Sequence, residues 1–142
     1  MRKLILAGAI ATLGIALLAI PASASFDHHF RVFWKGSFQQ RTDGDAFRGK
    51  LFDPRNRDNR VGRDHGVTKF NEHAGEVHGT SHLSGEIGGF GDIKYRGNVR
   101  RGDNRLNVVG GSGDFNGVGG KLVFHNLNRS GTKEILEFDL VR

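Results

Sequence analysis

The chain alternates apolar and polar residues over short stretches through most of its length. Phe30, Val32 and Trp34 alternate with other residues, among them the charged Arg31 and Lys35. The same period of two occurs near Ile93 and near Leu136. A period of two places alternate side chains on opposite faces of a β-strand. The pattern predicts eight short strands, near residues 30–39, 47–52, 67–73, 76–87, 93–99, 106–108, 121–127 and 136–141.

Eight short strands at regular spacing, separated by glycine, asparagine and aspartate, are typical of an all-β antiparallel barrel or sandwich. We favour a closed eight-stranded antiparallel β-barrel, because an open sheet would leave the apolar last strand as an aggregation-prone edge. Glycines inside the predicted strands, such as Gly36, Gly79 and Gly97, suit the bends that closure requires. The polar segment 53–64 is expected to form a long surface loop near one barrel mouth.

The first 24 residues have the pattern of a signal peptide. Arg2 and Lys3 precede an uncharged run over residues 4–20, and Pro21 and the small residues 22–24 follow it. The expected domain organisation is a signal peptide at 1–24 and one β-barrel domain at 25–142. The alternative is a retained membrane anchor, although a run of 17 residues is at the short limit for spanning a bilayer. The predicted location is secreted, periplasmic or in the cell envelope, with no membrane contact after signal removal.

Composition and charge exclude several classes of function. The chain has no cysteine, so disulfides, zinc fingers and thiol chemistry are ruled out. Removing Arg2 and Lys3 lowers the net charge from +6 to +4, a mild excess. The arginines near residues 55–63 are interleaved with aspartate and asparagine, so nucleic-acid binding is not expected. This segment nevertheless supports an alternative function, namely a packed barrel whose surface binds anionic envelope polymers or a protein partner.

Candidate chemistry inside the barrel is limited to a few side chains. His78 and His82 share one face of a predicted strand, but a metal site needs a third ligand. We therefore predict no metal and no cofactor, and interpret both histidines as polar lining or as solvent-facing side chains. If they line a hollow barrel, His78 and His82 are also candidate ligand-binding residues. Trp34 and Tyr95 lie on apolar alternations, and if the interior is hollow they are the natural ligand-binding residues, each with one polar tip.

One glycine-rich stretch resembles a known family signature. Its residues are Gly110, Gly111, Ser112, Gly113, Phe115, Gly117 and Gly120. This spacing is similar to the G-G-[ST]-G-x-F-x-G-x-x-G motif of allene oxide cyclases and the related dirigent proteins. Further stretches in the same order, around Gly44, Lys50, Gly62 and Ile93, extend the resemblance over residues 44–142. The resemblance implies an eight-stranded barrel with an apolar cavity, a small hydrophobic or phenolic ligand, and a possible homo-oligomer.

The catalytic residues of the cyclases are not carried over. Gly49 stands where they have asparagine, Thr68 where they have cysteine, and the region 30–45 lacks their glutamate and proline. Allene oxide cyclase activity is therefore not expected. We predict an exported barrel that binds a small apolar or aromatic ligand through Trp34 and Tyr95 without covalent chemistry. A shape-directed cyclase or isomerase is the other alternative, and it would depend on an acid or base such as His78 or His82.

Overall fold

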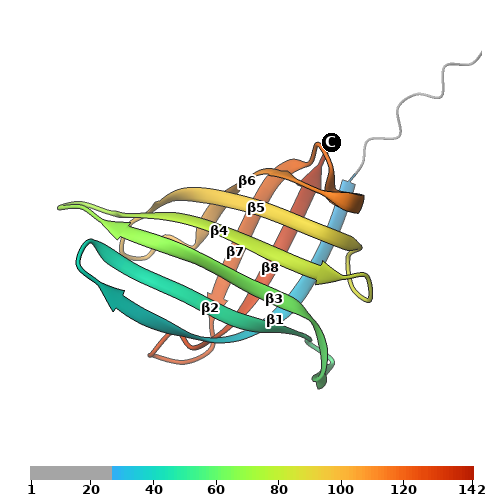
Figure 1. The fold of residues 1–142 in the computed structure, drawn as a ribbon, viewed down its shortest axis with the longest axis horizontal. Helices are drawn as coiled ribbons and strands as arrows, with labels where there is room; N and C mark the ends of the chain where they lie inside the picture. The colour runs from blue at the N-terminus through green and yellow to red at the C-terminus, as the bar shows by residue number, and fades with distance from the viewer. Residues whose placement is uncertain (1–26) are drawn as a thin grey trace, which may run out of the picture.

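The computed structural model describes residues 27–142, and within them the chain forms one closed eight-stranded barrel (Figure 1). The predicted signal peptide lies outside the described residues. No helix in the described part of the chain is long and apolar enough to cross a bilayer. The elements are β1 (Asp27–Arg41), β2 (Gly44–Asp53), β3 (Asn56–Phe70), β4 (Gly75–Ser84), β5 (Phe90–Val99), β6 (Arg105–Gly111), the 3-10 turn η1 (Gly113–Phe115), β7 (Gly119–Asn126) and β8 (Lys133–Val141).

Each strand pairs antiparallel with its neighbours in the sequence, and β1 pairs with β8 to close the barrel. Phe30 lies opposite Phe138 across this seam, and Trp34 lies opposite Glu134. Side chains that alternate in the sequence therefore point alternately into and out of the barrel. The prediction of an all-β, closed antiparallel barrel is confirmed.

The prediction of a long surface loop over residues 53–64 is wrong. β2 ends at Asp53 and β3 begins at Asn56, so only Pro54 and Arg55 form the connection. The pairing register shifts twice between Leu51 and Asp53, which marks a bulge in this hairpin. Bulges raise local twist and sit at barrel rims. Polar residues fill these strand ends because they point into solvent on both faces.

The two ends of the barrel are built differently. The hairpin turns after β1, β3, β5 and β7 gather at one end, which we call the open end. The connections after β2, β4 and β6 gather at the other, together with the start of β1 and the end of β8. This follows from antiparallel order, because successive turns must alternate between ends.

The second end is filled by aromatic and aliphatic side chains, and we call it the closed end. The rings of Phe30 and Phe138 stack with centroids 5.0 Å apart, and Phe115 lies 6.2 Å from Phe30. Phe115 comes from the η1 turn of the glycine-rich motif and is fully buried. Gly113 starts this turn at φ 62°, a left-handed conformation that favours glycine. The motif therefore acts as a plug that seals one end of the barrel.

Candidate functional site

The open half of the barrel contains a cavity of about 270 Å³. Its wall is mostly apolar, and it reaches the turns of the open end, where Phe38 and Phe70 are partly exposed. The polar groups inside it are few and come from different strands. The side chains that line it include Trp34, Phe47, Asp64, Tyr95, Phe124 and Glu134.

The aromatic rings of this wall rest on glycines of neighbouring strands. A Cβ atom added at Gly49 would lie 2.3 Å from Trp34 Nε1, and one added at Gly36 would lie 2.3 Å from the same indole. At Gly79 it would lie 2.3 Å from Cζ of Tyr95. Such contacts are impossible, so the glycines provide the space that the rings occupy. Glycines inside strands, which suggested bends, thus also shape the cavity.

Asp64 is a buried carboxylate at the bottom of the cavity. It projects inward from β3 with 3% of its surface exposed. The hydroxyl of Ser81 donates a hydrogen bond to Asp64 Oδ1 at 2.7 Å, and the phenol of Tyr95 lies 2.9 Å and 3.0 Å from its two oxygens. This arrangement fixes the position of the carboxyl, because both donors come from adjacent strands of a rigid barrel.

Two carboxyl groups in the cavity have raised pKa values. Burial raises the pKa of Asp64 to about 7, against the opposing effect of the hydrogen bonds from Ser81 and Tyr95 and of the nearby Trp34 indole. Burial, together with the charge of Asp64, raises the pKa of Glu134 to about 7 as well. Burial and the same charge raise the pKa of Tyr95 well above its usual value. Near neutral pH the cavity therefore holds carboxyl groups that both give up and accept protons readily.

The indole N–H of Trp34 is a buried donor that has no hydrogen-bond partner within the described residues. Nε1 meets no acceptor at hydrogen-bonding geometry within residues 27–142, although it lies close enough to Asp64 to lower the pKa of that carboxyl. Buried donors are nearly always paired, by protein, water or ligand. This atom is therefore available to an acceptor on a bound molecule.

The structure places His78 and His82 on the outside of the barrel. His78 contacts Glu76, and His82 pairs with Asp92 and stacks on His65. Neither lines the cavity, so a cyclase or isomerase that depends on these histidines has no support. No group of three potential metal-ligating side chains occurs within residues 27–142.

Trp34 and Tyr95 do line the cavity, as the sequence suggested for a hollow barrel. Their role in ligand binding stays a prediction. The sequence reasoning missed Asp64 and Glu134. Glu134 was visible in principle, since it continues the inward positions of Leu136 and Phe138. Asp64 was hidden because its segment was interpreted as a loop.

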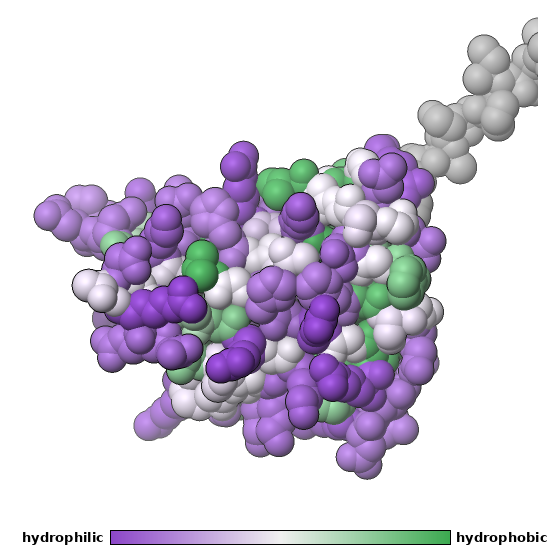
Figure 2. All heavy atoms as spheres, viewed as in Figure 1, coloured by the Kyte–Doolittle hydropathy of each residue, from purple (hydrophilic) through white to green (hydrophobic). Residues whose placement is uncertain are grey.

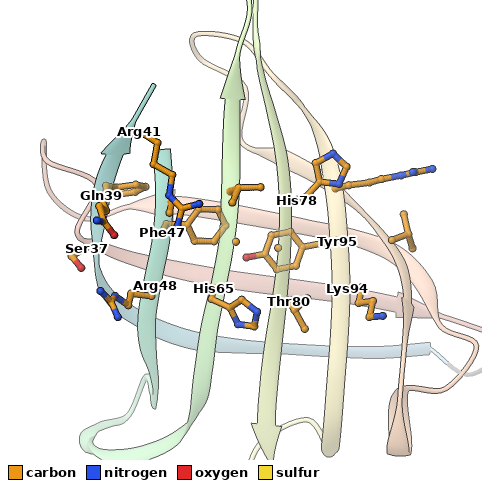
Figure 3. A pocket seen from close by; sticks show the side chains of 17 residues that line it. Ser37, Gln39, Arg41, Phe47, Arg48, His65, His78, Thr80, Lys94 and Tyr95 are labelled. Carbon is orange, nitrogen blue, oxygen red and sulfur yellow. The ribbon is translucent and has the colours of Figure 1, made fainter. Parts of the chain in front are cut away.

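A second hollow, of about 900 Å³, lies on the outer face of the barrel (Figure 3). Arg41 and Arg48 border it on one side and Lys94 on the other, with His65 and Thr80 between them. Phe47 and Tyr95 contribute to this hollow as well as to the inner cavity. Next to these rings, Gly66 of β3 is paired with Gly79 of β4. The barrel wall is therefore thin at this glycine pair.

Comparison with known proteins identifies the fold. No family model matches the chain, and no curated protein matches its sequence. Among solved structures, a pyocyanin demethylase is 19% identical with a TM-score of 0.61, covering 79% of this chain and 98% of that one. A pterocarpan synthase dirigent protein is 14% identical with a TM-score of 0.60, covering 82% of this chain and 87% of that one. The chain thus has the dirigent-like barrel fold that the motif resemblance predicted.

Proposed function

We propose that the barrel interior binds a small aromatic molecule and that Asp64 and Glu134 exchange protons with it. One observation carries this proposal. An apolar cavity of about 270 Å³ encloses two carboxyl groups whose pKa values are raised to about 7. Ionisable groups whose pKa values are shifted by burial inside a cavity are candidates for a functional site.

The lining of the cavity sets the class of ligand. The rings of Trp34, Phe47 and Tyr95 suit a flat aromatic body, because stacked or tilted ring pairs gain more than their buried area alone. The unpaired indole N–H offers a hydrogen bond to a carbonyl or phenolic oxygen. Among residues 27–142, no lysine, arginine or histidine lines this cavity. A neutral aromatic, or one with a basic nitrogen facing the carboxyl groups, is therefore favoured over an anion.

The structural neighbours support a small-molecule ligand without identifying it. One is named for acting on pyocyanin, and the other for synthesis of a pterocarpan. Both share the barrel, but sequence identities of 19% and 14% are too low to transfer a substrate.

The acid pair also favours a second candidate function, isomerisation or cyclisation directed by the cavity. Two groups with pKa values of about 7 can supply one proton acceptor and one proton donor at neutral pH. The carboxylate of Asp64 would take a proton from one atom of the ligand, and the carboxylic acid of Glu134 would return one to another. This replaces the outward-facing histidines as the source of acid–base chemistry.

A fluorescence titration tests the binding proposal. Trp34 is the single tryptophan, so its emission reports directly on the cavity. A panel of phenols and nitrogen heteroaromatics is titrated into the wild type, Asp64→Asn and Asp92→Asn. Asp92 is the matched control, because its carboxylate lies on the outer face and pairs with His82.

We expect saturable quenching by at least one compound class, weakened in Asp64→Asn and unchanged in Asp92→Asn. Calorimetry in buffers of different ionisation enthalpy should show proton uptake or release on binding, which disappears in Asp64→Asn. If every compound leaves the Trp34 emission unchanged, the interior is not a ligand site. If binding occurs without proton exchange, the acid–base part is wrong. Monitoring each ligand for slow conversion to an isomer distinguishes binding from catalysis.

A further inference from the structure

A row of four cationic side chains crosses the outside of the barrel. Lys133 of β8 lies opposite Lys35 of β1, Lys35 opposite Lys50 of β2, and Lys50 opposite Arg63 of β3. All four side chains are exposed. We call these four residues the basic ladder. Neighbouring strands lie about 4.8 Å apart, so the ladder presents a regular line of positive charge perpendicular to the strands.

The basic ladder has no compensation from carboxylates. None of its four side chains forms an ion pair within 4 Å with a carboxylate of residues 27–142. Like charges directly opposite each other on adjacent strands destabilise a sheet. Three such pairs in succession therefore destabilise the folded barrel. Surface residues can usually be replaced without harm to folding, so a repeated destabilising arrangement indicates a functional role.

The hollows beside the basic ladder extend the positive charge. Arg48, Lys94 and Arg96 line the outer hollow of Figure 3, and Arg48 and Arg63 line a neighbouring one. In the described part of the chain, the single carboxylate in the lining of either hollow is that of the buried Asp64. Figure 2 shows the face over β2–β5 as hydrophilic over much of its area, with white and green patches between the purple ones. The floor also offers neutral hydrogen-bonding groups such as Thr80.

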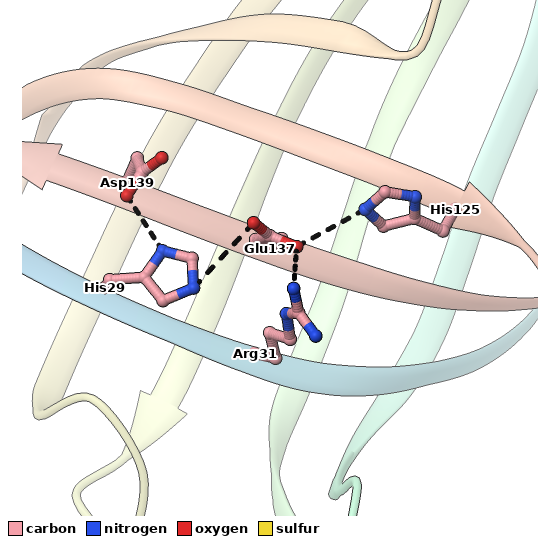
Figure 4. Close-up of polar contacts among 5 residues, drawn as sticks. All are labelled: His29, Arg31, His125, Glu137 and Asp139. Atoms are coloured by element: carbon pink, nitrogen blue, oxygen red, sulfur yellow. Dashed lines mark hydrogen bonds and ion pairs between the residues drawn. The ribbon is translucent and has the colours of Figure 1, made fainter.

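One cluster on the outer surface does pair its charges. On the outer face of β1, β7 and β8, Glu137 contacts Arg31 at 2.8 Å, His125 at 3.4 Å and His29 at 3.7 Å (Figure 4). His29 also contacts Asp139 at 2.8 Å. Arg31 is thus paired with a carboxylate, whereas the basic ladder is set apart by the alignment of its four cations on adjacent strands.

We propose that the basic ladder and the adjoining hollows bind an acidic polysaccharide. A linear polymer with one carboxylate per sugar ring presents a row of negative charges that complements a line of cations. The neutral hydroxyl and glycine floor beside the ladder suits uncharged sugar rings, whereas the lysines and arginines suit the carboxylates. This site shares Arg63 with the polar segment 55–63 considered from the sequence, but its other three cations come from β1, β2 and β8. It does not depend on the ligand of the cavity.

Binding of polygalacturonate by the purified protein tests this proposal. Its affinity is measured by calorimetry over a range of salt concentrations for the wild type and two double variants. Lys50→Gln/Arg63→Gln removes half of the basic ladder. Arg100→Gln/Arg101→Gln removes the same charge from the β5–β6 turn at the open end, and serves as the matched control.

The ladder variant should lose affinity by about ten-fold or more, and the slope of log affinity against log salt should fall by about half. The control should change affinity by less than about two-fold. The ladder variant should also melt at a temperature equal to or above that of the wild type, because its like-charge contacts are relieved. That last result shows that lost binding is not lost folding.

Three results would overturn the proposal. Absence of binding at low salt would remove the site. Equal losses in the two double variants would show that net charge alone attracts the polymer. Equally tight binding of single-stranded DNA at the same ionic strength would show that the surface accepts any polyanion and is not selective for sugar acids.

Discussion

Replacing Asp64 by asparagine should change how the stability of the barrel depends on pH. The folded-state pKa of Asp64 is about 7, whereas an aspartate in an unfolded chain titrates near 3.9. The folded protein therefore binds this proton more tightly than the unfolded chain does. Stability that is present below about pH 4 is progressively lost as the pH rises to about 7, and stays lost above that.

The size of the effect follows from the difference between the two pKa values. About three units at 1.36 kcal/mol each correspond to roughly 4 kcal/mol. Asp64 is almost fully buried, so solvent screening does not reduce this figure much. Asparagine avoids the buried charge, but it weakens the hydrogen bonds from Ser81 and Tyr95 by about 1–3 kcal/mol. The variant should therefore be slightly less stable than the wild type in acid and more stable in base.

Urea denaturation followed by circular dichroism measures the free energy of unfolding at several pH values. The difference between variant and wild type should shift by about 4 kcal/mol in favour of the variant between about pH 4 and about pH 9. Some slope will remain, because Glu134 also has a raised pKa. Asp92→Asn, on the outer face, should not reproduce the shift. If the free energy of unfolding changes with pH in the same way in the wild type and in Asp64→Asn, the argument that ionisation of the buried Asp64 destabilises the fold is refuted.

Two further predictions concern the support of the cavity. Tyr95→Phe removes the phenol that hydrogen bonds to Asp64, so the pKa of that carboxyl should rise further, as a ¹³C NMR titration would show; an unchanged titration would mean that the phenol does not stabilise the carboxylate. Gly79→Ala places a methyl group against the ring of Tyr95 and should cost about 1–3 kcal/mol of unfolding free energy. Gly119→Ala is the control for chemical denaturation, because the nearest atom to its added Cβ is 3.9 Å away; equal losses in both alanine variants would contradict the ring-support interpretation.

The strand pattern was readable from the sequence because each inward face is apolar over several residues. The inward positions of Phe30, Val32 and Trp34 are an example, and the structure buries all three. The prediction of a loop over residues 53–64 was wrong because hairpin arms that extend beyond the core have no apolar face. The alternation that identifies a strand is therefore missing from this part of the sequence. Because this strand was not predicted, Asp64 was also missed. Its role depends on whether its side chain points into or out of the barrel.

The basic ladder could not have been found from spacing along the chain. Lys35, Lys50, Arg63 and Lys133 are far apart in sequence, and they become neighbours only through the register of three strand pairs. Register depends on the bulge and on barrel closure, neither of which a single sequence specifies. The same holds for the contact between the Trp34 ring and Gly49, which joins two strands.

The plug formed by Phe115 separates the part of the barrel that holds it together from the part that holds a ligand. Rings stacked at the closed end keep the strands in place whatever occupies the open half. Residues such as Phe124 and Val77 around the cavity can therefore change in size with little effect on closure. A protein built this way is a ready template for engineering, because new binding preferences can be selected at one end while the other end is left untouched.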